Sequence, residues 1–366
     1  MASLGPTLPG LAAQTQSTVS EISFLFTVRS FGFLLGSLFS GRFYDRLPGH
    51  AVMAVTVVGV SATMAAMSLV TSLPLVLLVM LVLGTAEGAL GVGGNALLVW
   101  VQGNRVAPYM NALHFSYGVG GFLAPLIIAR TLGFNNSNST AYLVLAAIIL
   151  PTALVLLRIP SPQSVAVDST VARGATTDYR MVFLIALLLC LYIGAEVSYG
   201  GWIFNYVLKT GIGNENRAAY LTSVFWGSLT LGRLLGVPIG ARFRPQTILM
   251  ADLIGCFVSI GVALARPGSI VAISISTILA GLSMASVYPT ALTFAERRMR
   301  ITGLITGFLV VGGSAGGMIV PMIVGQLFES IGPLVMMYTI LVDLVLMLLV
   351  YVVMVGYRSR EVQATA

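Results

Sequence analysis

Gly120-Gly121-Phe122-Leu123-Ala124-Pro125 and Gly316-Gly317-Met318-Ile319-Val320-Pro321 repeat one pattern, Gly-Gly-x-x-x-Pro, inside two long apolar segments. The two copies lie 196 residues apart, and the same offset places Leu35-Gly36 on Leu231-Gly232. Two halves built on one plan, with hydrophobic segments interrupted by Gly and Pro, are typical of secondary transporters. The repeat therefore predicts a membrane protein made of two related helix bundles.

The composition indicates a chain that lies in a lipid bilayer. Hydrophobic residues make up 57% of the chain and charged residues 8%, and the mean hydropathy is +0.96. A soluble domain could not expose so much apolar surface. Continuous apolar runs rich in Gly favour packed helices over a β-barrel. Eleven spans are expected, at Ile22–Arg42, Ala51–Val70, Leu75–Val101, Asn111–Thr131, Tyr142–Leu157, Met181–Leu208, Ala219–Ala241, Ile248–Leu264, Ile270–Phe294, Ile301–Leu327 and Pro333–Tyr357.

The repeat also predicts a helix at the start of the chain. Shifting Met181–Leu208 back by the same offset places Gly201 on Gly5. Met1–Leu11 is therefore expected to be the exit end of a first helix whose opening ~15–20 residues are absent. The alternative is an ordinary disordered leader.

These observations predict an all-α integral membrane fold of two pseudo-symmetric six-helix bundles, with eleven full transmembrane helices and a remnant of the first. The N-terminal bundle is expected at residues 1–158 and the C-terminal bundle at 181–366. Residues 159–180 contain prolines and charges without apolar periodicity, which is typical of a cytoplasmic linker.

The net charge of +7 indicates orientation in a membrane and not a nucleic-acid partner. If the connection after Arg42 is cytoplasmic, thirteen Arg residues lie on that side and only four basic residues on the other. This is a positive-inside bias. We expect a monomeric, multi-pass protein of the plasma (inner) membrane with a cytoplasmic C-terminus.

The segment Gly41-Arg42-Phe43-Tyr44-Asp45-Arg46-Leu47-Pro48-Gly49 follows the first full predicted span. It resembles the Gly-x-x-x-Asp-Arg-x-Gly loop of the major facilitator superfamily, with one extra residue before the last Gly. Small residues let helices approach, and Asp45 could meet a helix N-terminus or an Arg in one conformation only. Gly41, Asp45 and Arg46 are thus interpreted as a gate latch; the alternative is a plain charged turn.

Arg233 lies beside a stripe of glycines on a second-half span. Gly232, Gly236 and Gly240 recur every four residues and are expected to pack closely against a neighbouring helix. Arg233 is expected at the cytoplasmic rim, where it could belong to the gate.

Three further segments place polar and aromatic residues inside apolar spans: Tyr192–Tyr206, Asn111–His114 and Ser286–Thr290. Together they resemble the sugar-transporting branch of the same superfamily, which includes fucose permease and the sodium-dependent glucose transporters. The resemblance covers essentially the whole chain. It implies a transporter that exposes a central solute site to the two sides of the membrane in turn.

Glu196, Tyr199, Trp202 and Asn205 form the predicted core of the substrate site. Tyr199 and Trp202 are spaced i, i+3 and can share a helix face. Aromatic faces stack on the C–H surfaces of sugars, while Glu, Asn and Tyr bond hydroxyls. Trp202 could instead be an interfacial belt residue. The other candidate cavity residues are Asn95, His114, Tyr117, Trp226 and Tyr288; His114 could alternatively make only a local hydrogen bond at a helix end.

Glu87 lies near the centre of the Leu75–Val101 span. An acid there must be buried in protein, hydrated or protonated, and this suits coupling to H⁺ or Na⁺. The resemblance points the same way, because fucose permease carries an acid in this helix. The repeat partner of Glu87 is Ser283, so the halves differ here. The alternative is a structural pair with Arg29 in the Ile22–Arg42 span. No cofactor or metal beyond the coupling ion is expected.

Other classes of function fit less well. Gly312-Gly313-Ser314-Ala315-Gly316 matches the Gly-x-Ser-x-Gly nucleophile pattern, but both histidines of the chain lie at the ends of other spans. An enzyme is therefore disfavoured, and a channel or a receptor would not need duplicated halves with conformational latches. The sequence predicts a secondary transporter of a small polar solute, most simply a sugar, and leaves a proton-coupled multidrug efflux antiporter as the alternative.

Overall fold

The computed structural model describes residues 2–135, 138–162, 178–299 and 302–357. Within these residues every regular element is a helix, and eleven helices are long and apolar enough to cross a membrane. The predicted all-α fold with eleven full spans is confirmed. The predicted linker falls mostly outside the described residues.

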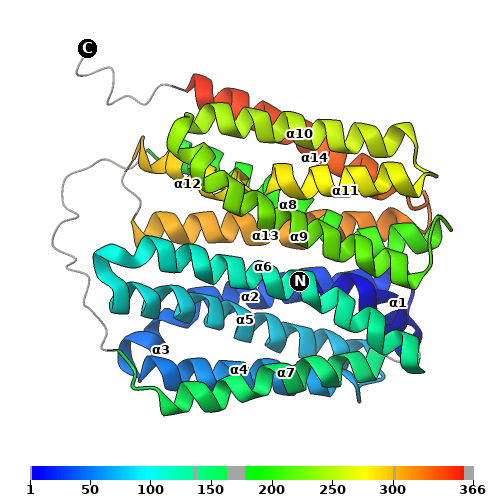
Figure 1. Ribbon diagram of the computed structural model, residues 1–366, viewed down its shortest axis with the longest axis horizontal. Helices are drawn as coiled ribbons and strands as arrows, with labels where there is room; N and C mark the ends of the chain where they lie inside the picture. Colours follow the sequence, from blue (N-terminus) through cyan, green and yellow to red (C-terminus); the bar gives the residue numbers. More distant parts are fainter. Residues whose placement is uncertain (1, 136–137, 163–177, 300–301, 358–366) are drawn as a thin grey trace.

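The helices of the two halves occupy different parts of the molecule and run along its long axis (Figure 1). The first half comprises α1 (Leu4–Thr15), α2 (Val19–Phe39), α3 (Gly41–Arg46), α4 (Gly49–Met67), α5 (Leu73–Gln102), the 3₁₀ turn η1 (Gly103–Arg105), α6 (Val106–Asn135) and α7 (Asn138–Arg158). The second half comprises α8 (Tyr179–Lys209), α9 (Glu215–Arg242), α10 (Pro245–Ala265), α11 (Ile270–Met284), α12 (Val287–Glu296), α13 (Gly303–Phe328) and α14 (Val335–Gly356).

The 196-residue offset holds for the helices themselves. It carries α2 onto α9, α4 onto α10, α6 onto α13 and α7 onto α14, with the starting residues agreeing to within one position. It also carries α1 onto the last turns of α8, as the repeat predicts. Gly5 packs directly on the carbonyl of its repeat partner Gly201.

One helix breaks the symmetry. The continuous helix α5 corresponds to two helices, α11 and α12, which are separated at Ala285-Ser286. The Ser286 hydroxyl donates to both carboxylate oxygens of Asp252 on α10, at 2.9 and 2.7 Å, and so does not cap α12. Pro289 is the sequence signal of this break, because it lacks the N–H that would bond the Ala285 carbonyl in a continuous helix, whereas its counterpart in α5 is Gly93.

Glycines set the closest helix contacts within each bundle. A side chain at Gly36 or Gly84 would overlap the backbone of the facing helix in the α2–α5 pair. Gly316 of α13 lies against the Cys190 carbonyl of α8 in the same manner. Of the predicted glycine stripe, Gly232 packs closely, but Gly240 has no neighbour within 4 Å of a built Cβ. The expectation of close packing at Gly240 was wrong, because no other helix packs against this face of α9 near its linker-end terminus.

The two bundles meet through two repeat-related helix pairs, α2 with α13 and α6 with α9. Hydrogen bonds between α2 and α13 run from Ser20–Gln326, at 2.6 Å, to Ser30–Gly317, at 3.1 Å. They lie in the half of α2 remote from the linker that joins the bundles; we call this side of the molecule the far end and the other the linker end. The bundles are therefore tied together at the far end.

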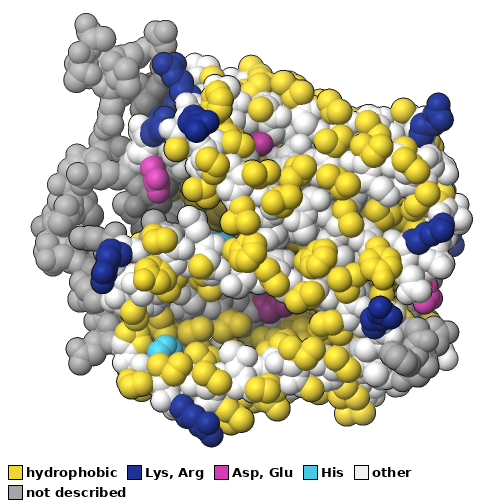
Figure 2. Space-filling model, viewed as in Figure 1, with side chains coloured by type: hydrophobic (Ala, Val, Ile, Leu, Met, Phe, Trp, Pro, Cys, Tyr) yellow, Lys and Arg dark blue, Asp and Glu magenta, His cyan; other side chains and the backbone are white. Residues whose placement is uncertain are grey.

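Toward the linker end the same helices are more exposed. On α2, Leu25 and Phe26 of the far half are buried, whereas Phe39 is 53% exposed. On α9, Phe225 is buried and Val237 is 54% exposed. The two bundles are therefore in contact at the far end and separated at the linker end. Figure 2 shows apolar side chains along the whole of one face, with Lys and Arg gathered toward its two ends.

We predict that Gly316→Ala destabilises the protein by about 3 kcal/mol or more, because the new Cβ overlaps backbone that cannot move cheaply. The measurement is the melting temperature of the purified protein in detergent. Gly240→Ala is the matched control, and its Cβ meets open space. It should raise stability by roughly 0.5–1 kcal/mol through reduced chain entropy. Equal effects of the two substitutions would contradict this account of the packing.

The far-end closure predicts a specific cross-link. A Cβ built on Gly317 lies 3.7 Å from that of Ser30, which suits a disulfide. In a background with Cys190 and Cys256 replaced by Ala, the Ser30→Cys/Gly317→Cys double variant should oxidise readily and lose transport. Reductant should restore transport, and each single variant should be insensitive to oxidant. Full transport by the oxidised double variant would show that the far end need not open.

Candidate functional site

Arg29 and Glu87 form an ion pair in the middle of the N-terminal bundle. The Arg29 Nη2 lies 2.6 Å from Glu87 Oε1 and 2.5 Å from Oε2, and it is the one ion pair between side chains of the described residues. Gly84 and Gly88 let α5 approach α2 so closely that Arg29 reaches across. Arg29 is buried and Glu87 is 24% exposed. The structural pair that the sequence left open is present.

The C-terminal bundle carries a second charged cluster. Glu196 of α8 is buried and accepts a hydrogen bond from the Tyr192 hydroxyl one turn earlier. Arg233 of α9 interacts electrostatically with both residues. Arg233 thus lies within electrostatic range of a predicted substrate residue, although the two form no ion pair. Its role in the gate stays a prediction.

Tyr117 of α6 lies between the two charged clusters. Its side chain is 60% exposed, yet it interacts electrostatically with Arg29 and Glu87 of one bundle and with Glu196 and Arg233 of the other. His114, one turn toward the linker end, also lies within the field of Arg233. Charged groups of both halves therefore lie within electrostatic range of the exposed Tyr117, and we call the region around Tyr117 the central site.

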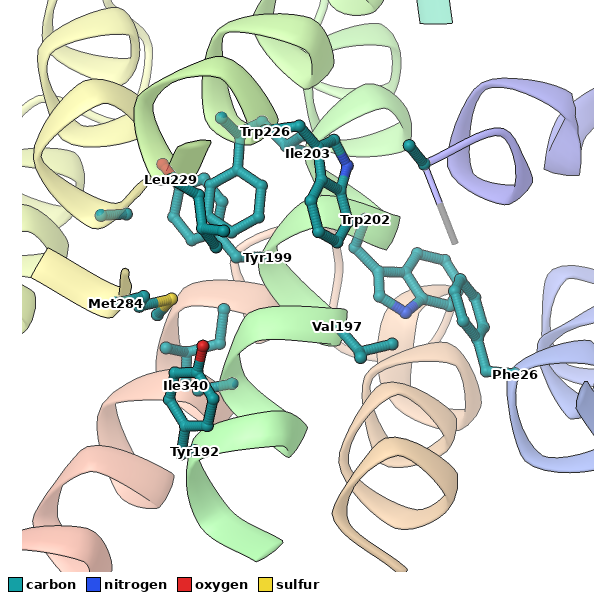
Figure 3. Close-up of a cluster of buried hydrophobic side chains, with 14 of the residues drawn as sticks. Phe26, Tyr192, Val197, Tyr199, Trp202, Ile203, Trp226, Leu229, Met284 and Ile340 are labelled. Carbon is teal, nitrogen blue, oxygen red and sulfur yellow. The ribbon is translucent and has the colours of Figure 1, made fainter. Parts of the chain in front are cut away.

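The predicted aromatic residues lie in a different layer, toward the far end. Trp202 is completely buried between Phe26 and Phe328, and its indole N–H donates to the Pro321 carbonyl at 3.0 Å (Figure 3). Tyr199 stacks on Phe225. These buried aromatic side chains fill the space between the helices on the far-end side of the central site. The predicted contact of these rings with substrate stays a prediction.

Asn205, Asn95 and Tyr288 make local contacts. Asn205 Nδ2 donates to the Gly5 carbonyl at 3.2 Å and so ties α1 to α8. Asn95 Nδ2 donates to Gly91 of its own helix. Tyr288 is half-buried against the apolar core. Their assignment to the substrate site is a prediction.

The predicted gate residues lie on the short helix α3 at the linker end. Tyr44 anchors α3, because its hydroxyl donates to the Ala89 carbonyl at 3.0 Å. Asp45 and Arg46 are exposed, and no side chain of the described residues pairs with either one. Gly41 faces open space. The assignment of Gly41, Asp45 and Arg46 to a gate stays a prediction.

Sequence reasoning missed Asp252 and Ser223 among the polar groups in the spans. Asp252 holds the Ser286 hydroxyl at the helix break, and buried Asp343 has one carboxylate oxygen without a partner. Ser223 and the predicted cavity residue Trp226, both on α9, also bury donors without a partner. An acid in an apolar run was the available signal for Asp252, but nothing local marks Ser223.

Neither of the other chemistries raised by the sequence has support in this geometry. Ser314 lies within the packed helix α13, where a Gly-x-Ser-x-Gly nucleophile would require a turn. Among residues 2–135, 138–162, 178–299 and 302–357, no cluster of three His, Cys, Asp or Glu side chains is arranged to bind a metal.

Comparison with known families decides the class of protein. The sequence profile of the Major Facilitator Superfamily matches residues 1–321. The chain belongs to the major facilitator superfamily. It is therefore a membrane transporter and not an enzyme, and the resemblance stated from the sequence is confirmed.

Relatives within the superfamily carry names that refer to sugar. Sodium-dependent glucose transporter 1 of Xenopus laevis is 30% identical over 393 residues, covering 99% of this chain and 80% of that protein. Sodium-dependent glucose transporter 1A of Mus musculus is 28% identical, covering 89% of this chain and 86% of its own length.

A solved structure of a mutant of the nucleoside transporter NupG has a TM-score of 0.75 at 17% identity, with 97% of this chain and 95% of that chain covered. An inward-facing, occupied bacterial homologue of the lysosomal transporter Spinster has a TM-score of 0.77 at 13% identity, covering 96% and 93%. These similarities show that the chain has the same overall fold as the two solved structures.

We predict that Glu87→Ala destabilises the transporter by about 3 kcal/mol, because it leaves the buried Arg29 charge unpaired. The double variant Arg29→Met/Glu87→Met should recover most of that stability, since an apolar pair of similar volume replaces the ion pair. Both are read from thermal melts in detergent. A double variant no more stable than the single one would show that the pair does not determine stability.

Proposed function

We propose that this transporter moves a small polyhydroxylated solute, foremost a sugar, by alternating access, with H⁺ or Na⁺ as the coupling ion. The observation that carries the proposal is the central site, where Arg29 and Glu87 of one bundle and Glu196 and Arg233 of the other lie within electrostatic range of Tyr117. Carboxylate, phenol and guanidinium groups supply both donors and acceptors, which hydroxyl groups require. The names of the glucose-transporting relatives support the same class of solute.

The mechanism follows from the distribution of contacts between bundles. With the far end closed, solute exchanges with the linker end. Far-end opening requires the α2–α13 hydrogen bonds to break, and linker-end closure brings Asp45 toward the N-terminus of α13, the helix that packs against α2. Glu87 binds the coupling ion, and Arg29 holds the carboxylate in place when the ion leaves. The excess of Arg on one side supports a cytoplasmic linker and C-terminus. We further propose that the protein lies in the plasma membrane and works as a monomer.

Purified protein in liposomes tests this proposal. Labelled glucose should accumulate when an inward H⁺ or Na⁺ gradient is imposed, and collapse of that gradient should release it. A nucleoside and a lipophilic cationic dye are the comparison substrates. Extrusion of the dye without sugar uptake would favour the efflux antiporter.

We predict that Glu87→Gln abolishes gradient-driven accumulation of sugar while downhill exchange continues. The amide can still accept a hydrogen bond from Arg29 but cannot bind and release a proton or carry the charge that attracts a cation. The readout compares initial uptake with and without the gradient. Intact accumulation in this variant would refute the coupling role of Glu87.

A further inference from the structure

The contacts of α2 with α13 show what the Gly-Gly-x-x-x-Pro pattern does. Pro321 has no N–H, so the carbonyl of Gly317, four residues earlier, loses its helical partner. The Ser30 hydroxyl donates to that carbonyl at 3.1 Å. Thr27 donates to the next carbonyl, that of Met318, at 2.9 Å. In this interface a side-chain hydroxyl of the opposite bundle therefore replaces the backbone N–H that the Gly317 carbonyl lacks.

The repeat-related interface, α6 with α9, is not filled. Pro125 removes the helical partner of the Gly121 carbonyl in the same way. The counterpart of Ser30 is Trp226, whose Cβ lies 3.5 Å from a Cβ built on Gly121. Trp226 is 95% buried, since its exposure is 5%, and its indole N–H has no partner. The hydroxyl that Ser30 supplies in one half has no equivalent here.

A second donor repeats the observation. The counterpart of Thr27 is Ser223, which lies one turn from Trp226 on the same face of α9. Ser223 is 1% exposed, and its hydroxyl also lacks a partner. Two filled positions on α2 thus correspond to two unfilled positions on α9. Buried donors without partners are rare in folded proteins, and each one calls for a physical explanation.

We propose that a hydroxyl group of the transported solute occupies this position, accepting from the indole N–H of Trp226 and donating to the carbonyl of Gly121. A hydroxyl is the simplest group that does both at once. Ser223 bonds a neighbouring oxygen of the same solute. The inference rests on the proposed function and adds the α6–α9 face as the specificity-determining wall of the central site.

The position fits the rest of the site. Trp226 belongs to the cluster that contains Tyr199 and Trp202 (Figure 3) and lies edge-on to Phe225, at a centroid distance of 5.3 Å. Thr230, one turn toward the linker end, packs on Gly118, which is adjacent to Tyr117. A solute held at Tyr117 therefore needs to extend about one helical turn, ~5 Å, to reach the indole. A hexose spans that distance.

The test compares glucose with its monodeoxy analogues in liposomes and in binding titrations of the purified protein. The wild-type protein should discriminate against one deoxy analogue, and Trp226→Phe should lose that discrimination. Removing the N–H while keeping an aromatic ring should raise KM for glucose about tenfold at unchanged kcat. Trp100→Phe is the matched control. Trp100 lies near the linker-end terminus of α5, outside the proposed contact, so this variant should retain discrimination and KM.

The possible results distinguish a failure of the Trp226 proposal from a failure of the proposed sugar transport. Wild-type protein that binds no glucose overturns both. Glucose transport with unchanged discrimination in Trp226→Phe overturns only the assignment of Trp226. A fall in kcat for every analogue alike assigns Trp226 to the motion of α9 and also overturns it. If Trp226→Phe does not fold, Ser223→Ala decides, with loss of discrimination against an analogue deoxygenated at the neighbouring carbon as the supporting result.

Discussion

Every backbone carbonyl that loses its helical partner inside a bilayer must be bonded by something else, because the lipid offers no donor. Pro321 and Pro125 each create such a carbonyl at the level where the bundles meet. Ser30 meets the first demand from the opposite bundle, and in doing so it ties α2 to α13. The contact between α2 and α13 thus depends on a backbone carbonyl that has no hydrogen-bond donor within its own helix.

The charged residues are placed by the close approach of helices that glycines allow. Gly84 and Gly88 bring α5 against α2, and this approach lets Arg29 meet Glu87 instead of lying alone in an apolar span. An ion pair at such a depth is costly to assemble and more costly to break. The same geometry leaves Glu87 partly accessible, so one residue can serve both the packing of the bundle and exchange of an ion with the central site.

The spans, the repeat and even the helix α1 could be predicted from the sequence, because apolar runs and a fixed offset are local or periodic signals. The Arg29–Glu87 pair was identifiable only as an alternative, since its formation depends on the distance between α2 and α5. Tyr199 and Trp202 were correctly placed on one helix, but helical spacing does not reveal which layer is closed. Trp226 was predicted only as a cavity residue, and its unpaired N–H emerged when the bonds of one half were compared with those of the other.

The break between α11 and α12 has a mechanical consequence. The continuous helix α5 transmits a displacement at one membrane surface to the other as a stiff rod. Its counterpart is jointed at Ser286, where a side-chain bond to Asp252 replaces the uninterrupted helical ladder. The first half therefore contains a rigid helix where the second half contains a helix that can bend. The two bundles share one topology but need not undergo displacements of equal size during a transport cycle.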